Sequence, residues 1–172
     1  MNKEKLKEFI HESILDRKQF DICHELYGHC LAEHVTDLLS LQNKLWDMPR
    51  ATDRNPIIVA TRFFSEEEAL QLLYDTLMDN IEYIQEWRRK LYLNETVIEK
   101  EFNEPVGEGI VKGADRSRLI PMHKITIVLS NGDSIGQPFY IKTAYPNRTF
   151  DDNDTCYDAI DEFQMKRKIR QQ

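Results

Sequence analysis

The apolar positions in the first third of the chain recur every three or four residues, the spacing of amphipathic helices. One such segment begins near the N-terminus, a second covers about residues 22–34, and a third follows Thr36 or Asp37, either of which can cap a helix. A polar connection, 48–62, comes next and contains one short apolar run at 57–60. The apolar positions that define the three predicted helices are Leu6, Phe9, Ile10 and Ile14; Ile22, Leu26 and Cys30; and Leu38, Leu39, Leu41 and Leu45.

The clearest pattern begins at Ser65. Ser65 and Glu68 have the spacing of a capping box, and Phe64 stands where a hydrophobic staple would be. Behind this start, apolar residues step by three or four positions as far as residue 91. The pattern predicts one long helix whose core-facing stripe is Leu70, Leu73, Leu77, Ile81, Ile84, Trp87 and Leu91.

The second half of the chain changes to the composition of β-strands. Segments 96–102, 124–129 and 139–145 are rich in β-formers, and glycines, prolines and an Asn-Gly turn separate them. The last two are predicted to pair antiparallel. Because helices precede strands, we expect an α+β protein whose N-terminal helices pack on a small antiparallel sheet. The tail is acidic first and basic last, which favours a final helix at about 154–169.

With 172 residues, 41% of them hydrophobic, the chain has the size and apolar content of one domain. We expect an N-terminal helix in 1–22, a core in 23–147 and a charged, helical tail in 148–172. The sequence has no apolar run of membrane-spanning length, and its charged start does not resemble a signal peptide. The chain has three cysteines, a small and odd number that does not suit a disulfide framework. Reduced cysteines indicate a cytoplasmic protein, in the producing cell or in a cell that it enters.

The formal net charge of −7 argues against a nucleic-acid substrate, because phosphate backbones favour basic surfaces. The charge is unevenly distributed, however. Segment 104–148 holds four acidic and six basic residues, a net charge of +2, and it contains two of the predicted strands. A basic surface that binds RNA is therefore compatible with the sequence.

The second predicted helix holds a possible metal site. On a continuous helix Cys23, Cys30 and His34 would share one face. The chain has no closely spaced cysteine pair and no second ligand cluster, so we predict no metal and interpret the cysteines as small core residues. His34 is then either a hydrogen-bonded core histidine or a general base, since the ordinary pKa of histidine suits proton transfer near neutral pH.

Two further segments carry candidate binding groups. Alternation along 139–145 predicts that Phe139, Ile141, Thr143 and Tyr145 share one face, with Thr143 and Tyr145 about 7 Å apart, so that their hydroxyl groups could bind one phosphate. The alternative is an ordinary half-buried strand, in which these residue types are favoured anyway. The segment 112–124 could bind a phosphate backbone or could be simply solvated. Its basic residues are Lys112, Arg116, Arg118, His123 and Lys124.

Taken in order, these motifs resemble one known family. They are Gly28-His29, His34-Val35, Phe63-Phe64-Ser65 at the start of a long helix with Trp87, a glycine-rich turn, and Lys142-Thr143-Ala144-Tyr145-Pro146. Over residues 23–147 the chain is similar to the RNase A-like toxin domain at the C-termini of bacterial contact-dependent inhibition proteins and other polymorphic toxins.

The resemblance implies a pancreatic-ribonuclease-like fold without disulfides, metal-independent cleavage of RNA to 2′,3′-cyclic phosphate ends, no cofactor, and a cognate immunity protein. DNA and membranes are not expected partners. The catalytic residues of the family correspond to His34, Thr143 and Tyr145. Its cationic residue corresponds to Lys44, with Arg50 and Arg62 as substitutes, because the Gly-Lys pair of the family is missing before Thr36-Asp37. We expect Lys112, Arg116, Arg118 and Lys142 to bind the RNA backbone.

Two other functions are compatible with the sequence. The acidic composition and the missing Gly-Lys pair favour a non-catalytic interaction protein, an accessory of a phage or a toxin system that keeps a toxin-like fold. A small metal-binding regulator built on Cys23, Cys30 and His34 is the second alternative.

Overall fold

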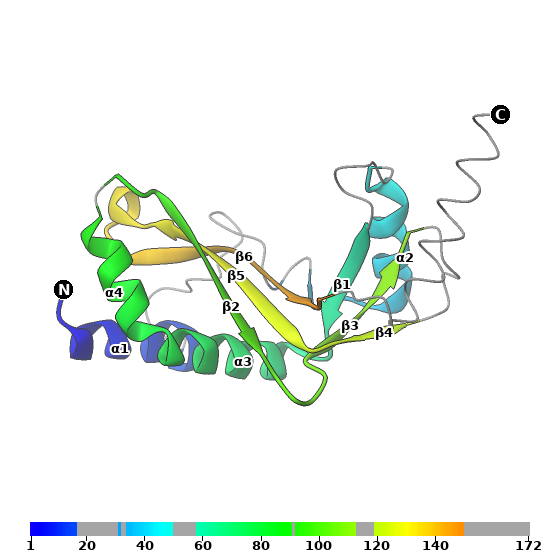
Figure 1. Cartoon of the computed structure of the whole chain (residues 1–172), viewed down its shortest axis with the longest axis horizontal. Coiled ribbons are helices and arrows are strands. Elements are labelled where there is room, and N and C mark those ends of the chain that lie inside the picture. The colour runs from blue at the N-terminus through cyan, green and yellow to red at the C-terminus, as the bar shows by residue number, and fades with distance from the viewer. Residues whose placement is uncertain (17–30, 32–33, 50–57, 91, 113–118, 150–172) are drawn as a thin grey trace.

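A computed structural model of the chain describes residues 1–16, 31, 34–49, 58–90, 92–112 and 119–149 (Figure 1). In chain order its elements are α1 (Lys3–His11), a π-helical turn η1 (Glu12–Asp16), α2 (Leu38–Asp47), β1 (Val59–Phe63), α3 (Glu66–Asp79), α4 (Ile81–Arg89), β2 (Glu95–Glu101), β3 (Gly107–Val111), β4 (Ile120–Met122), β5 (Lys124–Asn131), a 3-10 turn η2 (Asp133–Ile135) and β6 (Phe139–Asn147). Among these helices, none is both long and apolar enough to cross a membrane.

The strands form two antiparallel sheets, ordered β2-β5-β6 and β1-β3-β4. The α+β class is confirmed, and β2, β5 and β6 match the three predicted strands. The second sheet was not predicted. Its strands are short, and two of them contain residues that disfavour strands: glycines at 107 and 109 in β3, and Pro121 in β4. Strand β1 includes the last four residues of the connection expected at 48–62.

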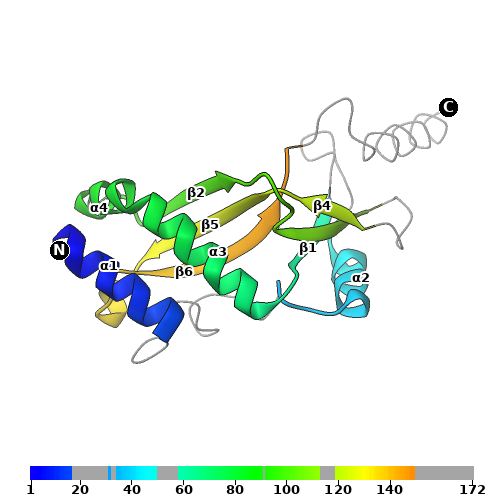
Figure 2. The same ribbon diagram turned by 90° about the horizontal axis from the view of Figure 1, so that it is seen from below.

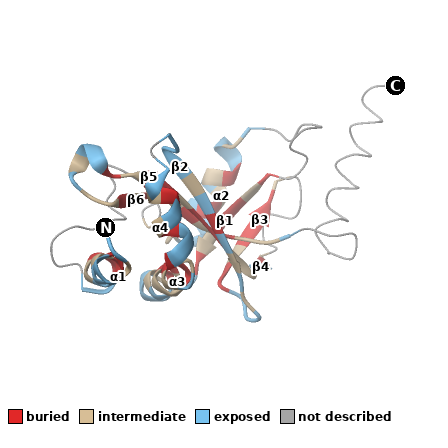
Figure 3. Cartoon of the chain, turned by 60° about the vertical axis from the view of Figure 1, so that its left-hand side comes forward, coloured by how far each residue is buried: buried red, intermediate tan, exposed pale blue. Residues whose placement is uncertain are grey.

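The main core lies between three helices and one face of β2-β5-β6. Helices α1, α3 and α4 cover this face, whereas α2 lies beside β1 at the other end of the molecule (Figure 2). Buried positions concentrate on the strands and on the inner sides of α1 and α3 (Figure 3). The predicted stripe is confirmed as part of this core by Leu73, Leu77, Ile81, Ile84 and Trp87, each at most 5% exposed.

The expected continuous helix over 65–91 is wrong in one respect: it is broken at Asn80 into α3 and α4. The Asn80 side chain donates from Nδ2 to the carbonyl oxygen of Thr76 at 2.8 Å. An asparagine amide that bonds to the backbone in this way competes with helix continuation. At the other end, Ser65 caps α3 as predicted, because its hydroxyl accepts from the backbone N–H of Glu68 at 3.1 Å.

Helix α2 begins behind Asp37, whose carboxylate accepts from the backbone N–H of Ser40 at 2.7 Å. This bond and a second one from the Ser40 hydroxyl lower the pKa of Asp37. The inner side of α2 builds a smaller core of Leu41, Leu45, Ile58, Ala60 and Ile110. Strand β1 joins the two cores, because Ala60 belongs to the smaller core and Phe63 to the main one.

Candidate active site

A β-bulge in β6 decides which side chains of this strand face away from the helices. Leu129 pairs with Ile141, whereas its neighbour Val128 pairs with Thr143, so Lys142 is an extra residue in β6. The expectation that Phe139 and Ile141 share a face with Thr143 and Tyr145 is therefore wrong. The bulge reverses the alternation: Phe139 and Ile141 are buried in the main core, and the two hydroxyl residues lie on the opposite, open face.

His34 lies in a turn between Leu31 and α2, where we had expected a helix. Its backbone carbonyl accepts from the N–H of Phe63 at 2.7 Å, which ties the turn to β1. The ring atom Nδ1 lies 3.1 Å from the carbonyl oxygen of Thr61. A carbonyl can only accept, so in the neutral ring Nδ1 carries the hydrogen and Nε2 is the nitrogen that can accept a proton. The residue is buried, with 7% of its surface exposed.

Tyr145 is the residue of β6 that meets this imidazole. The two ring centroids are 5.6 Å apart and the ring planes are inclined at 35°. Thr143 stands two residues before Tyr145 on the same face of β6, and its hydroxyl oxygen is buried without a hydrogen-bond partner in the described structure. Such a hydroxyl costs free energy unless a ligand satisfies it. The structure thus brings His34 to Tyr145, with Thr143 beside them on β6.

At Gly107 the backbone of β3 closely approaches both β1 and β6, and this lets His34 lie against Tyr145. A Cβ atom added to Gly107 would lie 2.4 Å from the carbonyl oxygen of Arg62 and 2.6 Å from Cγ of Pro146. Only glycine lets β3 contact β1 and the end of β6 at one point. The second sheet, which carries the hydrogen-bond partners of His34, is in this way held against the strand that carries Tyr145.

The predicted cations occupy different places. Lys44 is half-buried and lies in the last turns of α2, the helix that packs against the sheet β1-β3-β4. Lys112 donates to the carbonyl oxygens of Trp46 (3.1 Å) and Met48, so it caps the C-terminal end of α2. Arg62, the substitute for Lys44, is bound to Glu108 through Nε at 2.9 Å and to the carbonyl of Thr36 at 2.9 Å.

Lys142, the bulge residue, is exposed and forms an ion pair with Glu95 at 2.5 Å. This hydrogen bond raises the pKa of Lys142 and lowers that of Glu95. Arg50, Arg116 and Arg118 lie outside the described residues, as do Cys23, Cys30, the predicted second helix before residue 31 and the predicted final helix. Within the described ranges, no three His, Cys, Asp or Glu side chains are grouped as a metal site would require.

Sequence reasoning missed a polar cluster on the open face beside Tyr145. The hydroxyl of Thr126 donates to Glu99 at 3.0 Å, and the Lys124 ammonium lies 3.2 Å from the other oxygen of Glu99. Asn147 donates to the Thr126 hydroxyl at 3.3 Å. Part of the signal was present in the alternation of 95–101 and 124–131, because the residues on the open face of these strands are polar apart from Val97 and Val128.

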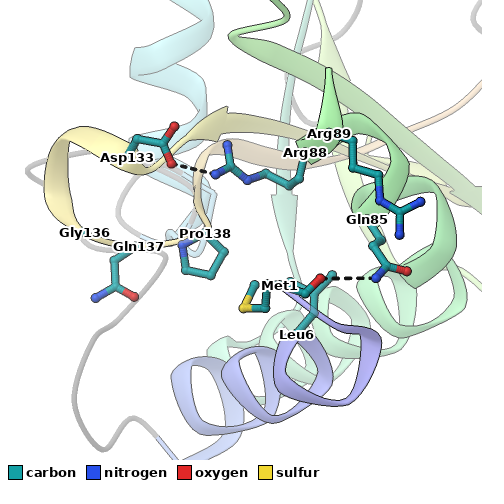
Figure 4. Close-up of a pocket in the computed structure, with 9 residues that line it drawn as sticks. All are labelled: Met1, Leu6, Gln85, Arg88, Arg89, Asp133, Gly136, Gln137 and Pro138. Carbon is teal, nitrogen blue, oxygen red and sulfur yellow. Dashed lines mark hydrogen bonds and ion pairs between the residues drawn. The ribbon is translucent and has the colours of Figure 1, made fainter. Parts of the chain in front are cut away.

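A cavity of about 430 Å³ lies at the opposite end of β6, between α1, α4 and the turn that precedes the strand (Figure 4). Arg88 and Asp133 form a 2.6 Å ion pair on its wall, which lowers the pKa of Asp133, and Gln85 donates to the carbonyl of Met1 at 3.2 Å. None of the predicted site residues lines this cavity. It is therefore distinct from the site of His34 and Tyr145.

The chain is similar to one known family and to one solved structure. The family model described as the bacterial CdiA-CT RNAse A domain matches residues 28–146, the part of the chain that contains His34, Thr143 and Tyr145. A crystal structure of a CdiA-CT/CdiI complex from Y. kristensenii 33638 has a chain with the same fold: the TM-score is 0.58 at 18% identity, over 70% of this chain and 99% of that one. Among curated proteins, none matches significantly.

Proposed function

Because the chain belongs to the bacterial CdiA-CT RNase A domain family, we propose that it is a ribonuclease toxin that cleaves RNA by attack of a ribose 2′-hydroxyl on the adjacent phosphate. The observation that carries the proposal is the pairing of His34 with Tyr145. A histidine whose Nδ1 donates to the Thr61 carbonyl presents the basic Nε2 beside a phenol, with the unpaired Thr143 hydroxyl on the same strand.

The proposed reaction uses these three side chains as follows. Nε2 of His34 takes the proton of the 2′-hydroxyl, and the resulting oxyanion attacks phosphorus. The bond from phosphorus to O2′ forms as the bond to O5′ breaks, which leaves a 2′,3′-cyclic phosphate and a 5′-hydroxyl. Thr143 donates to a phosphate oxygen, which satisfies its buried hydroxyl.

The phenol of Tyr145 has two possible roles, donation to the departing O5′ or orientation of the His34 ring. A substrate with p-nitrophenolate as the leaving group separates them, because this group departs without a proton. If Tyr145→Phe slows cleavage of RNA but not of a nucleoside 3′-(p-nitrophenyl phosphate), Tyr145 is the general acid. If both substrates are slowed equally, Tyr145 acts by orienting His34.

The experiment that tests the function is incubation of the purified chain with total RNA in the presence of EDTA, beside His34→Ala. Cleavage by the wild type alone supports the proposal, and intact RNA in both samples contradicts it.

A non-catalytic interaction protein is the second candidate, and the pairing of Arg62 with Glu108 favours it, because this arginine is then not available as the catalytic cation. The same experiment decides between the two.

The similar crystal structure is a complex of a toxin domain with CdiI. By analogy we propose that this chain also has a cognate immunity protein, which blocks the site of His34 and Tyr145, and that the chain acts in the cytoplasm of a target cell. Expression of the chain alone in the cytoplasm should be toxic to the cell, and co-expression of the neighbouring gene should remove the toxicity. This result would support both the immunity protein and the cytoplasmic site of action.

A further inference from the structure

The open face of β2-β5-β6 places a lysine next to the candidate site. Thr126 of β5 pairs with Glu99 on one side and with Tyr145 on the other, so the three residues form one row across the sheet. Lys124 pairs with Asn147, which makes it the diagonal neighbour of Tyr145 on the same face. Diagonal neighbours have Cα atoms about 7–8 Å apart, a distance that the flexible four-carbon stem of lysine can bridge.

Hydrogen bonds hold this lysine on the face. One carboxylate oxygen of Glu99 accepts a hydrogen bond from the Thr126 hydroxyl. The other carboxylate oxygen lies 3.2 Å from the Lys124 ammonium. The side chain of Lys124 is 16% exposed. A cation that is largely withdrawn from water interacts more strongly with an anion than a solvated cation does. Lys124 is thus positioned and only partly hydrated.

Three of the other candidate cations, Arg62, Lys112 and Lys142, are engaged more tightly. Arg62 bonds to Glu108 through two nitrogen atoms and to the Thr36 carbonyl through the third. Lys112 caps α2, and Lys142 is 49% exposed in a 2.5 Å pair with Glu95. The Lys124–Glu99 contact is longer than these pairs, so a phosphate oxygen can share the ammonium without displacing the carboxylate.

We propose that Lys124 is the catalytic cation of this site and contacts a non-bridging oxygen of the scissile phosphate, with Glu99 as its positioning residue. The inference rests on the proposed ribonuclease function and assigns to β5 the role that the resemblance gave to Lys44 on α2. Negative charge on the non-bridging oxygens grows as O2′ attacks, and a fixed ammonium stabilises that charge without giving up its proton.

The test compares Lys124→Met with Lys100→Met. Lys100 also pairs with a carboxylate, Asp79, but on the helix side of β2, so both variants remove one charge from the same sheet. The single-turnover rate on a defined RNA oligonucleotide is expected to fall about 10²–10³-fold in Lys124→Met, the usual effect of losing a transition-state donor. Lys100→Met should keep the wild-type rate, and Lys124→Arg should retain most of it. Melting temperatures of all variants verify folding.

A second measurement uses the same oligonucleotide with 2′-deoxyribose at the cut site, which binds without being cleaved. Its dissociation constant should rise about tenfold in Lys124→Met, the value of one charged hydrogen bond, and stay unchanged in Lys100→Met. Equal rates and equal affinities for the two variants, with loss of activity in Lys44→Met, would overturn the role of Lys124 and leave the ribonuclease function in place. A wild-type protein that neither cleaves nor binds would overturn both.

Discussion

Replacing His34 by asparagine separates the chemical role of this residue from its structural role. The asparagine amide can occupy the position of Nδ1 and keep the hydrogen bond to the Thr61 carbonyl, whereas nothing replaces Nε2. Of the two side-chain contacts described above, the one that is lost is the ring contact with Tyr145, worth about 0.5–1.5 kcal/mol. In a domain of this size, such a loss lowers the melting temperature by roughly 1–6 °C. A domain of ordinary stability stays almost fully folded at 25 °C.

The catalytic loss should be far larger. Removing a general base costs about 10²–10⁴-fold in rate, which the small change in folded population cannot produce. His34→Ala should reduce the cleavage rate by the same factor. It should also lower the free energy of unfolding by about 0.5–1.5 kcal/mol more, because the hydrogen bond to the Thr61 carbonyl is lost as well. Single-turnover cleavage and thermal unfolding of both variants measure the two effects. Wild-type cleavage by His34→Asn, or a rate loss that merely follows the melting temperature, would refute the assignment of His34 as the base.

Three further outcomes follow from the structure. Cleavage should persist in excess EDTA and leave 2′,3′-cyclic phosphate ends, while DNA stays intact because it lacks the nucleophile; activity that disappears with EDTA would contradict the mechanism. Gly107→Ala should lower the free energy of unfolding by about 1–3 kcal/mol, because its methyl group would overlap Arg62 and Pro146, and an unchanged denaturant midpoint would show that the sheets can separate there without cost. The pKa of Asp37 is lowered by Ser40 in the folded state, so its contribution to stability is present above its ordinary pKa of 3.8 and is lost as the pH falls through the lower folded value. Asp37→Asn removes this titration, so equal stability differences between wild type and variant at pH 7 and pH 3 would contradict the capping role.

The helices and the main sheet could be predicted because their patterns are long. The stripe behind Ser65 repeats often enough to identify a core-facing helix, and β2, β5 and β6 are seven to nine residues each. The break at Asn80 was hidden, because the apolar spacing continues across it. The short strands β1, β3 and β4 were hidden for the opposite reason: three to five residues are too few to show a periodicity, and β3 and β4 also contain glycine or proline.

The candidate site was predictable only in its residue identities. The resemblance identified His34, Thr143 and Tyr145, and the structure brings the first and the last into contact. Local alternation could not reveal the bulge at Lys142, because a bulge is defined by the partner strand. Alternation could place Lys124 and Glu99 on one face of their strands, but their proximity to each other and to Tyr145 depends on the register between β2, β5 and β6, which the sequence does not show.

The position of β1 between the two cores would make the proposed activity depend on a single local opening of the structure. His34 is tied to this strand at Thr61 and Phe63, whereas Tyr145 belongs to the sheet of the main core. If β1 detaches together with α2 and the second sheet, the main core can persist while the base is carried away from the phenol. Catalysis would then disappear in a partly opened form that still shows most of its helical signal. Amide hydrogen exchange at β1 would report the free energy of that opening, and loss of cleavage at low denaturant should follow it ahead of global unfolding.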